Sequence, residues 1–169
     1  MAAPNMRLLA ELFYYSKYVE YLDTIFLIVA GKPVSFLQYF HHLGAPIDMW
    51  ILAQYNNPAA WIFVVWNSII HTLMYAYYAC AIQGINLGAV KWLMTFLQIM
   101  QLFFGTATSF WYPLNLKWYR DDFKMMAGFA VSTFYTAALF VLFSDFFIKS
   151  YILGSKKPKP TTAPTKKAQ

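Results

Sequence analysis

The stretch KMMAGFAVSTFYTAALFVLFSDFF spans residues 124–147, and positions 125–144 within it carry no charged side chain. A helix needs about 20 mostly apolar residues to cross a bilayer, so this stretch predicts a transmembrane helix. Four further stretches of similar length and character occur at roughly 8–30, 34–55, 58–82 and 89–112. Short breaks that contain Gly, Pro or Asn separate them. We therefore expect about five transmembrane helices.

The second stretch, 34–55, has the weakest helical pattern of the five. Gly44, Ala45 and Pro46 lie in its middle, and a proline inside a helix removes a backbone donor and clashes with the preceding turn. We expect this span to be broken, kinked or partly re-entrant.

The composition of the chain is typical of a membrane protein. Of 169 residues, 60% are hydrophobic, 21% are aromatic and only 12% are charged, whereas about a quarter of a soluble domain is charged. The fold class that we predict is therefore all-α integral membrane. The single cysteine, Cys80, excludes an intrachain disulfide.

The net charge of +6 belongs to the C-terminal end of the chain. Residues 149–169 hold six lysines and no acid, and the remaining residues hold seven basic and seven acidic side chains. A nucleic-acid partner would need a basic folded surface, so we expect none. We divide the chain into a transmembrane domain at 1–150 and a disordered basic tail at 151–169, because Pro, Thr and Lys without apolar residues do not form a core.

The end of the tail indicates the orientation of the chain. Lys166 and Lys167 stand third and fourth from the carboxyl end, which matches the dilysine signal for return to the endoplasmic reticulum. The alternative is a basic tail that follows the positive-inside rule. Both interpretations place the C-terminus in the cytosol, and with five spans the breaks that contain Lys32 and Lys91 are cytosolic too.

Ionisable side chains occur inside the first predicted span, where each costs several kcal/mol and is a functional candidate. Lys17, Glu20 and Asp23 are spaced so that they share one face of a helix, which must point into the bundle. They form either a buried ion-pair network, in which Lys17 neutralises a carboxylate, or the frame of an active site. The two interpretations are compatible.

All three histidines lie in the predicted spans, accompanied by other polar residues at helical spacing. The stripes comprise Gln38, His41 and His42; Asn67, His71, Met74, Tyr75 and Tyr78; and Thr95, Gln98 and Gln101. Together with the first span, four helices each present a polar face in an otherwise apolar bundle. We expect these faces to line one interior cavity.

Several chemistries are compatible with three buried histidines. A membrane di-iron oxygenase needs more histidines than this chain has. A zinc ion on His41, His42 and His71 is possible by number, but adjacent helical side chains point about 100° apart, so we expect no metal. Imidazole then acts as base, acid or nucleophile, with amides and tyrosines stabilising a negatively charged oxygen. A thiol nucleophile is not expected, because no cysteine accompanies a histidine.

Four segments resemble motifs of the very-long-chain fatty-acid elongases. They are KYVEYLDT at 17–24, QYFHH at 38–42, NSIIHTLMYAYY at 67–78 and TFLQIMQ at 95–101. Their order and spacing are also similar to those of the family, over about residues 8–150. The resemblance implies a seven-helix bundle that encloses an acyl tunnel in the endoplasmic reticulum membrane, of which this chain would lack the first helices.

The resemblance also implies a reaction and roles for the residues. The enzyme would condense a long acyl-CoA with malonyl-CoA to give 3-oxoacyl-CoA, CoA and CO2, with no bound cofactor. His41 would carry the acyl chain, and His42 and His71 would assist decarboxylation and proton transfer. Thioester oxygens would be positioned by Asn67, Gln98 and Gln101. The site would be ordered by Lys17, Glu20 and Asp23, and further site residues are Gln38, Tyr75 and Tyr78.

The partners that the resemblance implies are the two acyl-CoA substrates and the bilayer, and it allows other enzymes of the elongation cycle or a second copy. Gln38, where many members have histidine, resembles the branch that elongates polyunsaturated chains. Glutamine can form hydrogen bonds but cannot transfer a proton. Two other functions remain open: a non-catalytic subunit that regulates an elongase, and a transporter or channel, although the sequence has no internal repeat.

Overall fold

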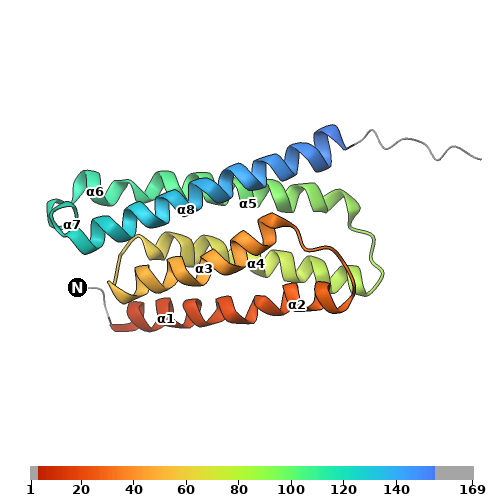
Figure 1. Cartoon of the computed structure of the whole chain (residues 1–169), viewed down its shortest axis with the longest axis horizontal. Helices are drawn as coiled ribbons and strands as arrows, with labels where there is room; N and C mark the ends of the chain where they lie inside the picture. Colours follow the sequence, from red (N-terminus) through yellow and green to blue (C-terminus); the bar gives the residue numbers. More distant parts are fainter. Residues whose placement is uncertain (1–3, 155–169) are drawn as a thin grey trace, which may run out of the picture.

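The fold is a bundle of helices, seen here in a computed structural model that describes residues 4–154 (Figure 1). No strand occurs in this part of the chain. The long helices are α1 (Pro4–Val19), α2 (Tyr21–Val29), α3 (Phe36–Gln54), α4 (Ala60–Ile82), α5 (Gly88–Ser109) and α8 (Phe123–Phe147). The prediction of an all-α fold is confirmed. Residues 155–169, with Lys166 and Lys167, lie outside the described range.

Local signals in the sequence explain where several helices begin and end. Ser35 caps α3 by accepting a hydrogen bond from the backbone N–H of Gln38, and Asp122 caps α8 in the same way. Helices α2 and α4 end in the same motif, in which Gly31 and Gly84 adopt positive φ angles of 65° and 79°. In each case the following residue donates a backbone hydrogen bond five residues back into the helix, a termination that favours glycine.

The first predicted span is interrupted and the second is continuous, which reverses the expectation from the sequence. The helix breaks for one residue at Glu20, and α1 and α2 run on in nearly the same direction (Figure 1). Of the alternatives expected for this span, a break at Gly44–Pro46 is wrong, since α3 runs through it from Phe36 to Gln54, and a kink stays a prediction. Pro46 removes only one backbone donor, and the α-helix continues on both sides of it.

The far end of α5 and the C-terminal end of α8 also differ from the expectation. Two short helices, α6 (Trp111–Asn115) and α7 (Lys117–Asp121), connect α5 to α8. A π-helix, η1 (Ile148–Leu153), extends α8. The predicted start of the disordered tail at residue 151 is therefore too early, because the chain is helical up to Leu153.

Five helical segments pack in a ring, if α1 and its continuation α2 are taken as one segment. In that order α1, α3, α8, α5 and α4 each contact the next, and α4 contacts α1 again. The segments lie side by side along the long axis, with the α2–α3 and α4–α5 connections at one end and α6 and α7 at the other (Figure 1). A ring of five helices leaves an interior that side chains from all of them can reach.

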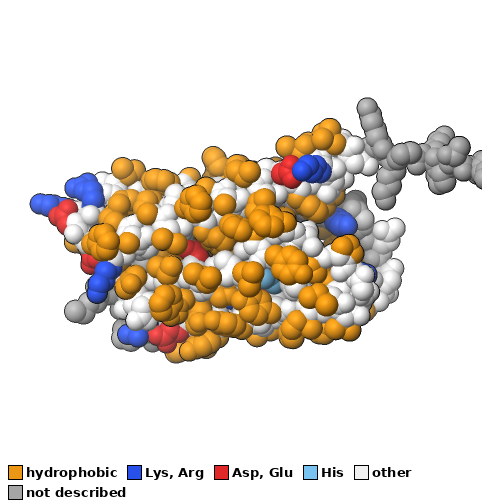
Figure 2. Space-filling model, in the orientation of Figure 1, with side chains coloured by type: hydrophobic (Ala, Val, Ile, Leu, Met, Phe, Trp, Pro, Cys, Tyr) orange, Lys and Arg blue, Asp and Glu red, His pale blue; other side chains and the backbone are white. Residues whose placement is uncertain are grey.

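The outer surface is suited to lipid. Hydrophobic side chains cover most of the face seen in Figure 2, and the charged side chains visible there lie mostly toward its ends. Two helical stretches, Val90–Asn115 and Phe123–Leu153, are long and apolar enough to cross a membrane. The other expected spans are not among these two stretches, so the number of spans stays a prediction.

Candidate functional site

An interior cavity of about 1080 Å³ runs along the ring of helices. This volume is slightly above the usual range of about 300–1,000 Å³ for ligand pockets. Its lining includes all the site residues predicted from the sequence within 4–154 except Glu20: Lys17, Asp23, Gln38, His41, His42, Asn67, His71, Tyr75, Tyr78, Gln98 and Gln101. The prediction that the polar stripes share one cavity is confirmed.

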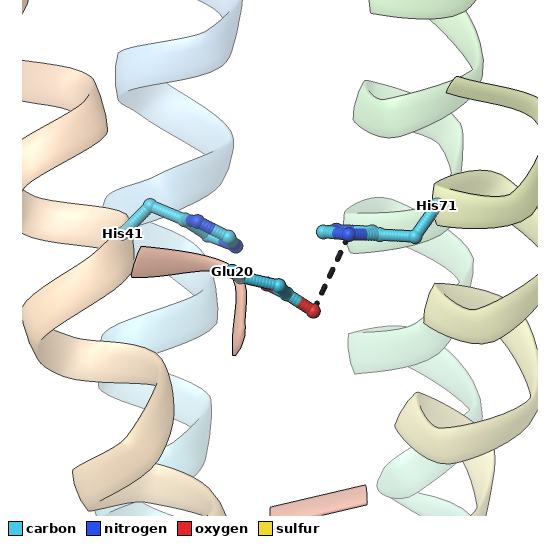
Figure 3. A group of neighbouring side chains, drawn as sticks. All are labelled: Glu20, His41 and His71. Carbon is cyan, nitrogen blue, oxygen red and sulfur yellow. Dashed lines mark ion pairs between the residues drawn. The ribbon is translucent and has the colours of Figure 1, made fainter. Parts of the chain in front are cut away.

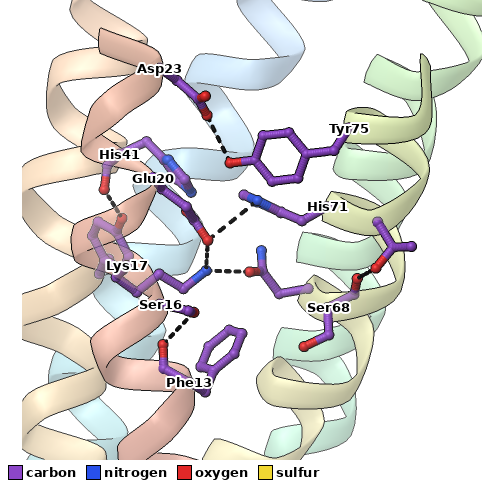
Figure 4. Close-up of polar contacts among 12 residues, drawn as sticks. Phe13, Ser16, Lys17, Glu20, Asp23, His41, Ser68, His71 and Tyr75 are labelled. Carbon is purple, nitrogen blue, oxygen red and sulfur yellow. Dashed lines mark hydrogen bonds and ion pairs between the residues drawn. The ribbon is translucent and has the colours of Figure 1, made fainter. Parts of the chain in front are cut away.

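Lys17 and Glu20 form a buried ion pair beside this cavity (Figure 4). The Nζ atom of Lys17 lies 2.7 Å from Oε1 of Glu20, and the two side chains are 3% and 10% exposed. Lys17 also donates a hydrogen bond to the amide oxygen of Asn67 on α4. The ion pair expected from the spacing on the first span is confirmed, and it is tied to a second helix.

Glu20, His41 and His71 approach one another from three helical segments (Figure 3). Oε1 of Glu20 lies 3.4 Å from Nδ1 of His71. The rings of His41 and His71 are stacked, with centroids 6.1 Å apart and an interplanar angle of 27°. Two imidazoles thus face each other across the cavity, and a carboxylate lies beside one of them.

His42 occupies a different environment from His41, although the two are neighbours in sequence. Its Nδ1 atom lies 3.2 Å from Oγ1 of Thr24, which also accepts a hydrogen bond from the side-chain amide of Gln38. Its ring stacks on Tyr21 at 6.3 Å. The rings of His41 and His42 nevertheless lie edge to face, with centroids 5.2 Å apart, and both line the cavity.

Asp23 and the tyrosines of α4 form the next layer of the cavity. The hydroxyl of Tyr75 donates a hydrogen bond of 2.9 Å to Oδ2 of Asp23 (Figure 4). The rings of Tyr75 and Tyr78 pack edge to face with centroids 6.2 Å apart. Asp23 therefore links α2 to α4, and Lys17 links α1 to α4 through Asn67.

The α5 side of the cavity carries amide and hydroxyl groups. The amide of Gln98 contacts Sδ of Met74 at 3.7 Å. Oγ1 of Thr95 lies 3.3 Å from the hydroxyl of Tyr151, which η1 places at this point. Gln101 lines the cavity and is only 8% exposed. These groups can bind an oxygen atom of a ligand on the side opposite α1.

One end of the cavity is basic. Lys32, in the loop after α2, and Lys91, near the start of α5, both line it, and both are exposed. These two lysines belong to the same end of the bundle, at the α2–α3 and α4–α5 connections (Figure 1). An anionic group at this entrance would meet two positive charges.

The ligand atoms of Glu20, His41 and His71 lie within 4.8 Å of one another, so these residues are the candidates for holding a metal ion. Two imidazoles and a carboxylate are the donors that zinc prefers. The ammonium group of Lys17 lies 2.7 Å from Oε1 of Glu20, which is the oxygen that lies 3.4 Å from Nδ1 of His71. A positive charge bonded to that oxygen opposes a second cation there, so the donor set fits an ion pair better than a metal.

Tyr135 and Asp48 are among the cavity residues that the sequence analysis missed. Tyr135 on α8 donates a hydrogen bond to the backbone carbonyl of His41. Asp48 on α3 lines the cavity, is 6% exposed and accepts a hydrogen bond from Ser132. Asp48 follows His41 by seven residues, which is two helical turns, so its position on the same face could have identified it.

Comparison with known proteins gives a consistent family. The family model described as "ELO: GNS1/SUR4 family" matches residues 1–159. "Very long chain fatty acid elongase 6" of Drosophila melanogaster is 32% identical over 145 residues, which cover 83% of this chain and 46% of the relative. "Fatty acid elongase sre1" of Dictyostelium discoideum is 36% identical over 152 residues, covering 86% and 54%.

A human relative shows the same pattern of coverage. "Very long chain fatty acid elongase 3" of Homo sapiens is 32% identical over 154 residues, which cover 87% of this chain and 54% of the relative. The chain thus spans about half the length of these curated relatives. No solved structure matches it.

Proposed function

This chain belongs to the ELO (GNS1/SUR4) family of membrane proteins, and on that premise we propose that it carries the condensing step of fatty-acid elongation. The substrates are malonyl-CoA and a long-chain acyl-CoA, and the products are 3-oxoacyl-CoA, CoA and CO2. We also propose that the acyl chain is polyunsaturated. This part of the proposal rests on Gln38, the first residue of the segment QYFHH at 38–42. Location in the endoplasmic reticulum with a cytosolic C-terminus rests on the tail.

The facing pair of histidines carries this proposal. A ring nitrogen of His41 attacks the thioester carbonyl of the acyl-CoA and the carbon–sulfur bond breaks. CoA leaves as a thiolate that takes up the imidazole proton, and the acyl group is held on His41. Malonyl-CoA then loses CO2 and becomes an enolate. The enolate carbon attacks the acyl carbonyl and the bond to His41 breaks. The stacking of His41 and His71 at 6.1 Å supports this, because both rings border the same space.

The other polar groups support the charge that develops in these steps. The enolate and the tetrahedral intermediate both place negative charge on oxygen, and preorganised donors in a dry cavity stabilise such charge. The amides of Gln98 and Gln101, on the α5 side, are suited to this role, and so is Asn67. Lys17 holds the amide oxygen of Asn67, which leaves the amide nitrogen free to donate toward the cavity.

The two ends of the cavity suit the two parts of an acyl-CoA. Lys32 and Lys91 at the entrance favour the phosphates of CoA, because cations attract phosphate oxygens. Away from this entrance the lining includes the apolar side chains of Met49, Phe63 and Leu102, which favour an acyl chain. A thioester between these parts would lie at the level of the histidines.

The proposal is tested by expressing the 169-residue chain in a yeast strain that lacks its own elongases. Polyunsaturated acids are supplied and total fatty acids are analysed by gas chromatography. We expect products two carbons longer than the supplied acids, and no such product from the His41→Ala variant at equal protein level. A saturated acid supplied in parallel tests the substrate class separately.

The absence of any longer product from the wild-type chain would overturn the proposal that this chain is catalytic. It would favour a non-catalytic subunit instead, if the chain then co-purified with a full-length elongase and changed its activity. Elongation that persists in His41→Ala would overturn the assignment of His41 while leaving the reaction in place.

A further inference from the structure

Asp48 lies in the cavity beyond the histidines, away from the lysine entrance. It follows His41 by seven residues, so it lies about 10 Å further along α3. On α4, Phe63 precedes His71 by eight residues and lies about 12 Å further in the same direction, because α4 runs opposite to α3. Both residues line the cavity. An acyl chain attached at His41 and running away from the entrance therefore approaches Asp48.

The carboxylate of Asp48 is only half satisfied. Its Oδ2 atom accepts a hydrogen bond of 3.1 Å from Ser132, whereas its Oδ1 atom is buried and has no hydrogen-bond partner within residues 4–154. Asp48 as a whole is only 6% exposed. Met49, the next residue on α3, and Phe63 on α4 also line the cavity, and their apolar side chains offer no donor.

We infer that Asp48 is a specificity-determining residue that sets the acyl-chain length at which binding stops improving. This inference rests on the proposed function. Each methylene that enters an apolar cavity improves binding. A saturated carbon that packs against the Asp48 carboxylate instead removes the little contact with water that the 6% exposed residue keeps and offers no hydrogen bond to its unpaired oxygen, which is unfavourable. The gain from further carbons is therefore offset once the chain reaches Asp48.

The inference separates polarity from size, because leucine is larger than aspartate and has no polar atom. If the polarity of Asp48 limits the chain, Asp48→Leu removes the limit and longer chains bind better. If only the space beside residue 48 limits the chain, the larger leucine moves the limit to shorter chains. Asp48→Asn is the matched control, since it keeps both the size and the polarity.

The experiment measures dissociation constants of saturated acyl-CoAs of increasing length for the whole chain in lipid nanodiscs. All variants carry His41→Ala so that no acyl group is transferred during the measurement. We expect affinity to rise with length and then level off in the His41→Ala background and with Asp48→Asn. With Asp48→Leu it should continue to rise, to on the order of ten-fold tighter binding at the longest chains.

A second pair of variants covers the case in which Asp48→Leu does not fold. Asp48→Ala and Asp48→Ser are similar in size and differ in polarity, so the alanine variant should bind the longest chains more tightly than the serine variant. Equal length profiles for these two, or a shorter limit with leucine, would overturn the inference while the proposed function stands. Failure to bind any acyl-CoA in the His41→Ala background and in the wild type would overturn both.

Discussion

The hydroxyl of Tyr135 on α8 donates a hydrogen bond of 3.0 Å to the backbone carbonyl of His41 on α3. The ring of Tyr135 lies directly over Gly44, where a Cβ atom would overlap it. Gly44 thus allows α3 and α8 to approach closely, one turn from the proposed nucleophile. We expect the position of His41 to depend on the contact between Gly44 and Tyr135. Neither Gly44 nor Tyr135 takes part in the proposed reaction.

Substituting Gly44 by alanine should therefore displace Tyr135 and shift His41. A displacement of about 1 Å at a reacting group can cost on the order of a hundredfold in rate, so we expect Gly44→Ala to lose most elongation activity. Tyr135→Phe removes only the hydroxyl and should cost about 1 kcal/mol of stability and less activity than Gly44→Ala. Product formation and thermal unfolding measure the two effects.

The matched control is Tyr39→Phe, because Tyr39 is an exposed tyrosine on the same helix and is absent from the cavity lining. It should behave as the wild type in both measurements. Full activity in Gly44→Ala would show that the packing of Tyr135 does not position His41.

We expect the stability of the fold to require both members of the buried Lys17–Glu20 pair. Removing one partner leaves a buried charge without compensation, which costs about 3–5 kcal/mol. Lys17→Met should therefore lower the free energy of unfolding strongly, and adding Glu20→Gln should recover part of the loss. Activity should not recover, since Asn67 and His71 would still lack their contacts with Lys17 and Glu20.

The exposed pair Arg7–Glu11 gives the comparison, with an ion-pair distance of 2.8 Å against 2.7 Å for Lys17–Glu20 but side chains that are 62% and 42% exposed. Arg7→Met should change the stability by less than about 1 kcal/mol. Similar losses for Lys17→Met and Arg7→Met would contradict the importance of burial.

The three histidines should contribute unequally. His41 and His71 both lie beside Glu20, whereas His42 contacts Thr24 and Tyr21 as well as the edge of the His41 ring. We expect His41→Ala to abolish product, and His71→Ala to reduce the rate by about 10²- to 10⁴-fold, as for the loss of an acid–base group. His42→Ala should have the smallest effect. Rates measured on microsomes with equal protein content check this order, and a normal rate for His71→Ala would refute its role.

The sequence predicts the part of this site that consists of polar side chains in apolar helices. Lys17, His41, His71 and Gln98 could be assigned to one cavity because ionisable and amide groups in apolar helices must face inward. Helical spacing then brings them onto common faces. The structure confirms that these residues gather around one cavity.

Other features depended on packing between helices that are distant in sequence. The break at Glu20 has no Gly or Pro to signal it, and Gly44 and Pro46 signalled a break that does not occur. At Gly44 the missing side chain serves the contact with Tyr135 instead. Such a contact joins residues on α3 and α8, so the local pattern around residue 44 could not show it.

The lysines at the cavity entrance should matter for CoA binding. Lys32 and Lys91 line this end, and contacts between exposed cations and phosphates strengthen binding modestly. Lys32→Ala and Lys91→Ala should each raise the KM for malonyl-CoA severalfold with little change in kcat, and higher salt should raise the wild-type KM. Lys117→Ala, on α7 at the opposite end of the bundle, is the control and should leave the KM unchanged. An unchanged KM in the Lys32 and Lys91 variants would place CoA elsewhere.

Chelation of metal ions should leave the activity intact. Glu20, His41 and His71 offer donors to a cation, but the ammonium group of Lys17 already lies 2.7 Å from the Glu20 oxygen among them. The proposed steps need imidazole and hydrogen-bond donors and no Lewis acid. Microsomes or purified protein treated with EDTA and then freed of it should elongate at the untreated rate, and elemental analysis should find no stoichiometric zinc.

The Lys17→Met variant is the informative comparison, because removal of the ammonium group frees the Glu20 oxygen. Zinc bound by Lys17→Met but not by the wild type would show that Lys17 keeps the three donors free of metal, whereas loss of wild-type activity on chelation and its return with zinc would assign them to a metal site.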